Sequence, residues 1–271
     1  MKLSIITVNL NNRDGLQRTI DSVISQTFTD YEWIVIDGGS TDGSRELIEQ
    51  YSDHFAYWCS EPDKGIYNAM NKGIVHAKGE WLQFLNSGDY LFKKYTLEKV
   101  FSYQHQADVL YGDMIIESEI NTEYRVYPDI LNLDFFYECS LGHQSSFFKH
   151  SLFKYRKYNE EYRIVSDWEY GLKLFSENYM FKHIPLFISV FENNGISTLF
   201  DSENIKERKK VLLDYIPIYY KQDIEYFYQI REREILIQKH KFLRWIALRQ
   251  EKKIFFISNL IKSFEKLKKN M

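Results

Sequence analysis

Short apolar, β-branched runs alternate with amphipathic helical segments over the first ninety residues, and this alternation restricts the possible folds more than any other feature. The strand-like runs are residues 3–8, 33–36, 56–59 and 81–85. Between the first two runs, apolar residues recur at the i, i+4, i+7 and i+8 spacing of one helix face, at Leu16, Ile20, Val23 and Ile24. Strands separated by helices pair in parallel, with helices on both faces of the sheet. The sequence therefore predicts an α/β fold with a mostly parallel central sheet flanked by helices.

The rest of the chain is less regular and divides in two. Between residues 93 and 200, we expect short strands at 109–111, 114–117, 123–126 and 187–191. One helix there begins with a predicted capping box, in which Ser166 is followed three residues later by Glu169. From residue 202 to residue 271 the pattern is helical. We therefore expect a body of residues 1–200 and a C-terminal helical extension of residues 202–271.

Polar clusters follow three of the predicted parallel strands. They are Thr7–Asn9, Asp37–Ser40 and Asn86–Asp89. Ligands of an open parallel sheet bind beyond the carboxyl ends of its strands, so the three clusters together indicate a site, although a single cluster would be explained as a turn. The chain has no GxGxxG pattern directly after its first strand and no GxxxxGKS or GxxxxGKT sequence. The dinucleotide-binding and P-loop classes are therefore excluded.

Charge is distributed unevenly along the chain. Residues 202–271 carry 17 Lys and Arg against 9 Asp and Glu, a net charge of +8, whereas residues 1–201 have a net charge of −11. The acidic body argues against nucleic acid as a partner, and the basic segment favours an anionic surface. There are only two cysteines, Cys59 and Cys139, and no apolar run approaches the roughly 20 residues that span a bilayer. We expect a cytoplasmic protein without a disulfide framework or a transmembrane anchor.

Four blocks of sequence resemble family 2 glycosyltransferases of the GT-A fold. In chain order they are Ile5–Asn9, Val35–Ser44, Glu61–Gly73 and Gly79–Asp89. The resemblance is dense over residues 3–92 and extends to about residue 198. It implies a Rossmann-like sheet in which residues 1–92 form a nucleotide-binding half and residues 93–200 an acceptor half. It also implies an inverting glycosyltransferase of the hexosyltransferase type, which uses a nucleotide-sugar donor and usually Mg²⁺ or Mn²⁺.

The resemblance also implies roles for individual residues. The residues at nucleotide-binding positions are Thr7, Asn9, Asp37, Gly38, Asp63, Gly65, Asn71, Asn86 and Gly88. Asp89 matches the metal-binding end of the family's acidic motif, His143 is a second candidate metal ligand, and Asp167 matches the catalytic base. The motif here reads Asn-Ser-Gly-Asp and holds one carboxylate. Because Mg²⁺ can take its other ligands from substrate phosphates, we expect weak metal binding without the donor.

Two of these residues can also be judged from the sequence around them. Asp167 falls in the first turn of a predicted helix, where the helix N-terminus favours the ionised form that a general base needs. The same dipole would stabilise an acidic residue with no catalytic role. His143 lies between a polar loop and an apolar run. It would contact the diphosphate, the metal or the acceptor, or would be an ordinary core or surface histidine.

Two other functions fit parts of the sequence. A non-catalytic module that binds a nucleotide-sugar or a glycan would explain the missing carboxylate at Gly88. A sugar-phosphate nucleotidyltransferase would need a Gly-rich signature with Arg or Lys near the N-terminus, which residues 7–12 lack. The sequence therefore disfavours the nucleotidyltransferase, whereas the binding module stays an alternative to a glycosyltransferase until transfer or donor hydrolysis, abolished by Asp89→Ala, is measured.

The last segment, residues 241–271, places apolar side chains at helical spacing among lysines. Such a helix either lies on an anionic membrane or packs on the body or on a second copy of the chain in a homodimer. A peripheral position on the inner face of the membrane would suit a lipid-linked acceptor. The resemblance implies a sugar or lipid-linked acceptor in the assembly of a bacterial surface polysaccharide or glycolipid.

Overall fold

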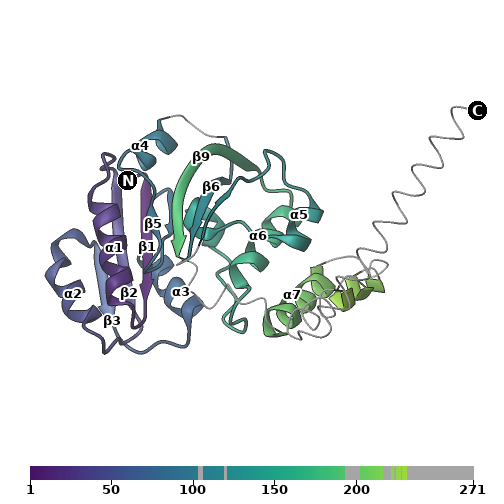
Figure 1. Ribbon diagram of the computed structural model, residues 1–271, viewed down its shortest axis with the longest axis horizontal. Coiled ribbons are helices and arrows are strands. Elements are labelled where there is room, and N and C mark those ends of the chain that lie inside the picture. The colour runs from purple at the N-terminus through teal and green to yellow at the C-terminus, as the bar shows by residue number, and fades with distance from the viewer. Residues whose placement is uncertain are drawn as a thin grey trace, which may run out of the picture. The chain divides into compact units, whose positions relative to one another are not determined.

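A curled β-sheet runs through the first of the two compact units into which the chain divides, residues 1–199 and residues 200–271 (Figure 1). In this computed structural model the described residues are 1–102, 106–118, 121–192, 202–215, 221–222, 224–226 and 228–230. The strands among them are β1 (Leu3–Asn9), β2 (Tyr31–Asp37), β3 (Tyr57–Ser60), β4 (Trp81–Phe84), β5 (Tyr90–Leu91), β6 (Val109–Glu117), β7 (Thr122–Arg125), β8 (Ser146–Lys149) and β9 (Phe181–Glu192). Their order across the sheet is β3-β2-β1-β4-β8-β6-β9-β5, and β7 pairs with β6.

The first four strands of the chain pair in parallel, as predicted. β1 lies between β2 and β4, and β3 pairs with the other side of β2. The register places Asn9 beside Asp37 and Asp37 beside Ser60. The polar residues at the carboxyl ends of these strands therefore meet at one edge of the sheet.

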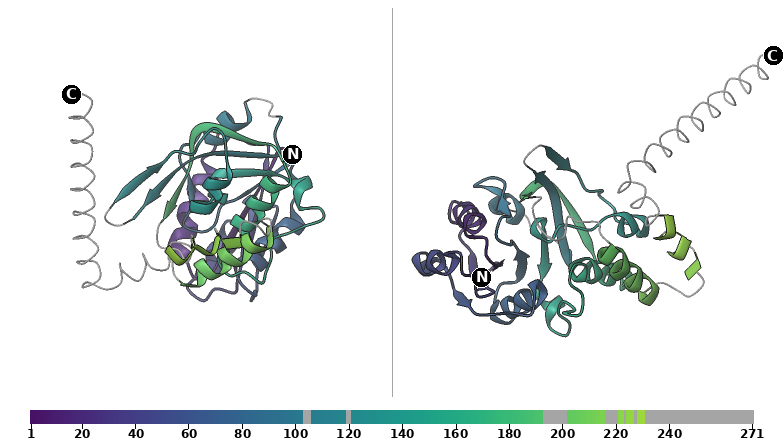
Figure 2. Two further views of the ribbon diagram at one scale, coloured as in Figure 1. Left: turned by 90° about the vertical axis from the view of Figure 1, so that its right-hand side faces the viewer. Right: turned by 60° about the horizontal axis from the view of Figure 1, so that its bottom comes forward.

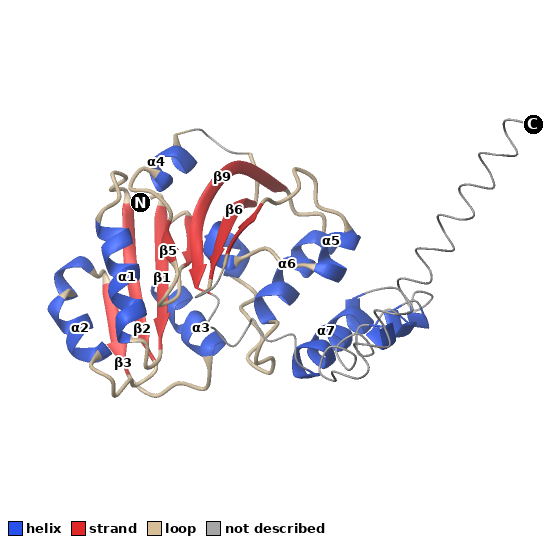
Figure 3. Ribbon diagram, viewed as in Figure 1, coloured by secondary structure: helices blue, strands red, loops and turns tan. Residues whose placement is uncertain are grey.

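Helices cover both faces of the parallel half of the sheet (Figures 1 and 3). The helices in the described residues are α1 (Arg13–Ile24), α2 (Ser44–Gln50), α3 (Ile66–His76), α4 (Thr96–Phe101), α5 (Leu133–Glu138), α6 (Ser166–Ser176) and α7 (Ser202–Tyr215). On β1, Leu3 and Ile5 join the core that includes α1 and α2, whereas Ile6 and Val8 join the core that includes α3 and α6. Burial on both faces explains why the strand is apolar without alternation.

The second half of the sheet differs from the predicted strands. β6 is one strand where two were expected, because the Gly112–Asp113 interruption is an irregularity in its pairing with β9. β9 is a long, curved strand that begins at Phe181, six residues before the predicted start (Figures 1 and 2). β8 was not predicted, and it inserts antiparallel between β4 and β6. A strand of four residues is too short to show a clear periodicity in the sequence.

The capping box predicted at the start of α6 does not form. Val165 is the N-cap residue, and no side chain caps the helix there. Ser166 is already helical and completely buried, and its hydroxyl has no hydrogen-bond partner among the described residues. The helix begins one residue earlier than expected, because packing buries Ser166 inside the first turn. Asp167 still lies in that first turn.

Within residues 200–271, the structure describes α7 and the pieces between residues 221 and 230. Ile205, Val211 and Leu212 of α7 are buried, and Lys209 forms an ion pair with Glu225. The predicted amphipathic segment 241–271 lies outside the described residues. Across the described part of the chain, no helix has both the length and the apolar character that crossing a membrane requires.

Candidate functional site

Asp37, the last residue of β2, is completely buried and accepts hydrogen bonds at both carboxylate oxygens. Asn9 Nδ2 donates to Oδ1 at 2.7 Å, and Ser60 Oγ donates to Oδ2 at 2.6 Å. Ser40 donates through its backbone N–H to Oδ2 at 2.9 Å and through its hydroxyl to Oδ1 at 2.5 Å. Burial alone would raise the pKa of Asp37, but these donors outweigh burial and lower the pKa. Asp37 is therefore a carboxylate at neutral pH, and it fixes the loop that follows β2.

The two predicted nucleotide contacts on β1 have different surroundings. Asn9 is buried beside Asp37, and its Oδ1 atom has no hydrogen-bond partner among the described residues. That oxygen is an acceptor that an N–H or O–H group of a ligand can satisfy. Thr7 is completely buried, and its hydroxyl accepts a hydrogen bond from the indole N–H of Trp33 at 3.0 Å. The nucleotide-binding role predicted for Thr7 stays a prediction.

Gly38, Asp63 and Gly65 lie close together beyond the end of β2. A Cβ atom on Gly38 would come within 2.6 Å of Asp63 Oδ2, so a side chain at position 38 would force Asp63 to move. Asp63 Oδ1 accepts a hydrogen bond from the N–H of Gly65 at 2.8 Å. Gly65 has a φ of +120°, which disfavours any residue with a side chain. The structure thus brings these three predicted nucleotide-binding residues together from two loops, one after β2 and one after β3.

Asn71, on α3, uses the polar atoms of its side chain to hold the segment around residue 160. Its Oδ1 accepts a hydrogen bond from Tyr158 N–H at 3.1 Å. Its Nδ2 donates to the carbonyl of Tyr158 at 2.9 Å and to Glu160 Oε1 at 2.8 Å. A nucleotide would have to displace one of these contacts to reach the Asn71 amide. The predicted nucleotide contact of Asn71 therefore stays a prediction.

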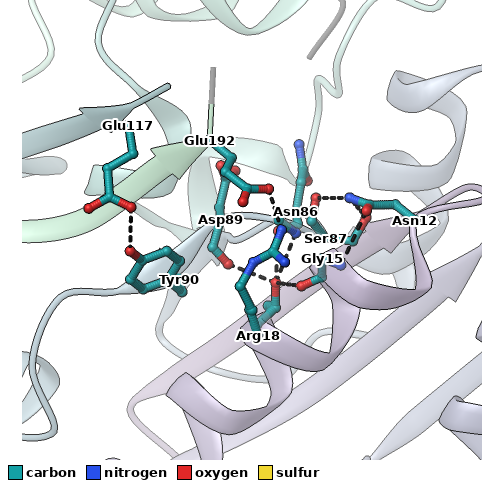
Figure 4. Close-up of polar contacts among 11 residues, drawn as sticks. Asn12, Gly15, Arg18, Asn86, Ser87, Asp89, Tyr90, Glu117 and Glu192 are labelled. Carbon is teal, nitrogen blue, oxygen red and sulfur yellow. Dashed lines mark hydrogen bonds and ion pairs between the residues drawn. The ribbon is translucent and has the colours of Figure 1, made fainter. Parts of the chain in front are cut away.

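The turn Asn86–Asp89, which follows β4, is fastened to α1 (Figure 4). Thr19 Oγ1 accepts a hydrogen bond from Gly88 N–H at 3.1 Å and donates one to the carbonyl of Asp89 at 2.7 Å. Gly88 has a φ of +101°, a conformation that disfavours a side chain. Gly88 stands where an acidic residue would supply a second carboxylate to the motif, and the backbone conformation of the turn favours glycine at this position.

Asp89 and Asn86 present oxygen atoms in nearly dry surroundings. Asp89 is 5 % exposed. Burial raises the pKa of its carboxyl to about 7, the charge of His143 opposes this rise, and Glu192 adds to it. Asn86 Oδ1 is buried and has no hydrogen-bond partner among the described residues. Beside this turn, Arg18 of α1 forms an ion pair with Glu192 of β9 (Figure 4).

No group of three or more His, Cys, Asp or Glu side chains in the described residues has the arrangement of a metal site. A metal ion at Asp89 would therefore take ligands from other oxygen groups, such as amides and the phosphates of a donor.

The carboxylate of Asp167, in the first turn of α6, receives three hydrogen bonds. Tyr67 OH and the backbone N–H of Trp168 donate to Oδ1, both at 2.9 Å. His143 Nδ1 lies 3.0 Å from Oδ2, and on the other side of the imidazole ring Nε2 lies 3.0 Å from Asn86 Nδ2. The structure thereby joins three predicted site residues, Asn86, His143 and Asp167, in one continuous line of contacts.

The side chains of His143 and Asp167 are 16 % and 21 % exposed, and their contact becomes an ion pair when the imidazole is protonated. Burial would lower the pKa of His143 and raise that of Asp167, but their hydrogen bond and charge attraction reverse both effects. The pKa of Asp167 is therefore lowered, and its carboxyl group is ionised at neutral pH. Both ring nitrogens of His143 face protein groups, so metal binding by His143 would require Asn86 to move. The predicted role of His143 as a metal ligand is untested.

Comparison with known proteins identifies the family. Residues 4–176 match the family model described as Glycosyl transferase family 2. The chain belongs to this family. A PGL/p-HBAD biosynthesis glycosyltransferase of Mycobacterium tuberculosis is 32 % identical over 215 residues, which cover 75 % of this chain and 82 % of that protein.

Solved structures share the fold of this family 2 glycosyltransferase. S. aureus TarS 1–349 in complex with UDP-GlcNAc has a TM-score of 0.64 at 19 % identity, and the match covers 84 % of this chain and 70 % of that chain. The mannosyltransferase PcManGT from Pyrobaculum calidifontis, in complex with GDP-Man and Mn²⁺, has a TM-score of 0.58 at 14 % identity, and the match covers 83 % and 68 % of the two chains. These likenesses confirm the predicted GT-A fold.

Three residues of this glycosyltransferase that contact the predicted site were missed from the sequence. Ser60 ends β3 at the same sheet edge as Asp37. The sequence signal that could have found it is the one used for the other strands, a polar residue at the carboxyl end of a parallel strand. Tyr67 lies inside the block 61–73 that carried the family resemblance, but nothing in that block indicates a contact 100 positions away. Thr19 lies on the buried face of α1, where a hydroxyl gives no sign of its partner.

Proposed function

We propose that this family 2 glycosyltransferase is an inverting enzyme, of the hexosyltransferase type, that moves a sugar from a nucleotide-sugar donor to an acceptor hydroxyl. The observation that carries the proposal is the line of contacts from the turn after β4, through His143, to the ionised carboxylate of Asp167. It joins a candidate base to the turn that carries the acidic motif. The TarS and PcManGT complexes with UDP-GlcNAc and GDP-Man support a nucleotide-sugar donor.

The nucleoside of the donor binds, in this proposal, at the sheet edge around Asp37. Asn9 Oδ1 supplies an acceptor that lacks a partner among the described residues, and the absence of a side chain at Gly38 lets the carboxylate of Asp63 lie against the same edge. Asp37 holds the backbone of the following loop in place through the hydrogen bonds from Ser40 and contributes a fixed negative charge. Side chains that are already fixed before the donor arrives lose little entropy when it binds.

The oxygen atoms of Asp89 and Asn86 fit a Mg²⁺ or Mn²⁺ ion. Both ions prefer hard oxygen ligands, and Asn86 Oδ1 is a buried oxygen without a partner in the described part of the chain. Asp89 and Asn86 would hold the ion together with the phosphate oxygens of the donor. A bound ion would neutralise negative charge on the departing nucleoside diphosphate.

Asp167 acts as the general base toward the acceptor. A carboxylate oxygen has two lone-pair directions, and Oδ1 is occupied by Tyr67 and Trp168, whereas Oδ2 receives only His143 among the described residues. Oδ2 therefore keeps one lone pair for the acceptor hydroxyl. The proton moves to Oδ2 while the acceptor oxygen bonds to the anomeric carbon, and the bond from that carbon to the diphosphate oxygen breaks. Attack opposite the leaving group inverts the anomeric configuration.

The substitution Asp167→Asn tests this assignment, because asparagine keeps the shape of the side chain but cannot take a proton. We expect kcat to fall by about 10²- to 10⁴-fold while the dissociation constant of the nucleotide-sugar donor changes little. Asp134→Asn is the matched control, because Asp134 lies exposed in the first turn of α5. Turnover close to that of the wild type in Asp167→Asn would refute the assignment. A non-catalytic binding module would bind the donor but give no transfer in the wild-type protein.

We also propose that the enzyme is cytoplasmic and works at the inner face of the membrane on a sugar or lipid-linked acceptor, in surface polysaccharide or glycolipid assembly. The net charge of +8 on residues 202–271 and the relative named for PGL/p-HBAD biosynthesis support this. Flotation with anionic vesicles should recover the protein at low salt and lose it at high salt. If it stays unbound and instead elutes as a homodimer, the basic segment packs on protein.

A further inference from the structure

We propose that His143 is a positioning residue, which aims the free lone pair of Asp167 and ties that carboxylate to the turn after β4. This inference rests on the proposed function, because it assumes that Asp167 is the base. His143 opens the short 3₁₀ segment His143–Ser145, and its ring lies between the carboxylate of α6 and the amide of Asn86.

The backbone around His143 is held from several sides. Gly142 N–H donates to Tyr127 OH at 3.0 Å, and Gln83 Nε2 of β4 donates to the carbonyl of Gln144 at 2.9 Å. A Cβ atom on Gly142 would come within 2.9 Å of Met114 Sδ, so β6 approaches this segment closely. The imidazole ring is therefore attached to a fixed support, as a residue that positions another side chain must be.

The contacts of the ring determine its hydrogen-bonding roles. A carboxylate only accepts, so the proton facing Asp167 is on Nδ1. The amide nitrogen of Asn86 only donates, so Nε2 accepts from it. A neutral imidazole protonated at Nδ1 satisfies both neighbours at once, and neither nitrogen has a lone pair to spare for a metal ion.

The orientation of the Asp167 carboxylate depends on His143 because its other two donors hold it less firmly. Tyr67 OH lies 2.6 Å from the carbonyl of Ile164 as well as 2.9 Å from Asp167 Oδ1, and its single proton cannot serve both acceptors fully. The Trp168 N–H comes from the next residue in the chain, so it moves with Asp167. His143 is thus the donor that holds the carboxylate from outside α6 without dividing its proton between two acceptors.

Two isosteric substitutions separate the two contacts of the ring. In His143→Asn, the amide nitrogen occupies the place of Nδ1, so the donor to Asp167 is kept and the contact with Asn86 is lost. In His143→Gln, the amide group reaches the place of Nε2, so the contact with Asn86 is kept and the donor to Asp167 is lost. We expect kcat of the Gln variant to be at least about tenfold below that of the Asn variant, with similar donor KM values in both.

Two further measurements keep the result interpretable. Mn²⁺ affinity in the presence of UDP, followed by electron paramagnetic resonance, should match that of the wild type in His143→Gln, which keeps the contact with Asn86. A rise in Tm on adding UDP shows that a variant is folded. His143→Ala replaces any variant that lacks this rise, and we expect it to lose as much kcat as His143→Gln. Equal kcat in the Asn and Gln variants, or in the Ala variant and the wild type, would overturn the proposal, as would a shared loss of Mn²⁺ affinity.

The Asp167→Asn background distinguishes this inference from the proposed function. If Asp167→Asn is active, the assignment of the base has failed, whatever the His143 variants do. If Asp167→Asn is inactive, the Gln substitution at position 143 should lower its residual rate no further, because the two residues act as one unit. Multiplicative losses in the double variant would show that His143 acts independently of Asp167.

Discussion

Replacing Thr19 by valine should loosen the turn that carries Asp89. Valine has nearly the shape of threonine but lacks the hydroxyl that accepts from Gly88 N–H and donates to the carbonyl of Asp89. Thr19, Gly88 and Asp89 are all buried, so water does not readily replace the lost partner. An unpaired buried backbone group costs about 1–3 kcal/mol, so two such groups should lower the free energy of unfolding by about 2–4 kcal/mol after some relaxation of the turn.

Thermal unfolding followed by circular dichroism, with and without UDP and Mn²⁺, measures this effect. A loss of that size corresponds to a fall in Tm of roughly 4–16 °C for a domain of this length. Thr19→Ser is the matched control, because it keeps the hydroxyl and loses one methyl group, at about 1 kcal/mol. Affinity for UDP with Mn²⁺ should also fall in the valine variant and stay close to that of the wild type in the serine variant. A valine variant as stable as the serine variant would show that the hydroxyl does not hold the turn.

Three further outcomes follow from the site. The pKa of Asp37 is lower in the folded protein than in the unfolded chain. Its carboxylate therefore stabilises the fold at pH values above the unfolded-chain pKa of about 3.9. This stabilisation is lost as the pH falls through the folded-state pKa. The difference in unfolding free energy between wild type and Asp37→Asn should therefore be constant from about pH 8 to 5 and narrow below about pH 4, and a constant gap at acid pH would contradict this. Gly88→Ala forces a side chain into a φ of +101° and should lower the unfolding free energy by about 1–3 kcal/mol, which urea denaturation measures; no loss would mean that the turn adapts. Calorimetry should show weak Mn²⁺ binding to the ligand-free protein and stronger binding once UDP is present, and tight binding without UDP would contradict a site that needs the phosphates.

The parallel half of the fold was predictable because its signals are local. A strand buried on both faces, as β1 is, must be apolar along its length, and the helix that follows must repeat its apolar residues at helical spacing. Residues that end such strands reach the same edge of the sheet whatever happens in the rest of the chain. For this reason the sequence alone predicts that Asn9 and Asp37 meet at one sheet edge, and the pairing of β1 with β2 aligns them there.

The second half was less predictable because its elements depend on partners distant in sequence. β8 is four residues long and becomes a strand by pairing with β4 and β6. Ser166 and Glu169 have the sequence of a capping box, but packing buries Ser166 and the helix begins at a different residue. Local propensity describes what a segment favours alone, and tertiary burial of this kind overrides it.

By itself, the sequence determined the α/β class, the edge at which polar residues collect and the family to which the chain belongs, since each depends on residues that are neighbours along the chain. Only the tertiary structure decided that Asn86, His143 and Asp167 form one line of contacts, across separations of 57 and 24 residues. A hydrogen bond requires two atoms within about 3 Å at a suitable angle. That proximity is set by how β4, the 3₁₀ segment at His143 and α6 pack, and no spacing in the sequence contains it.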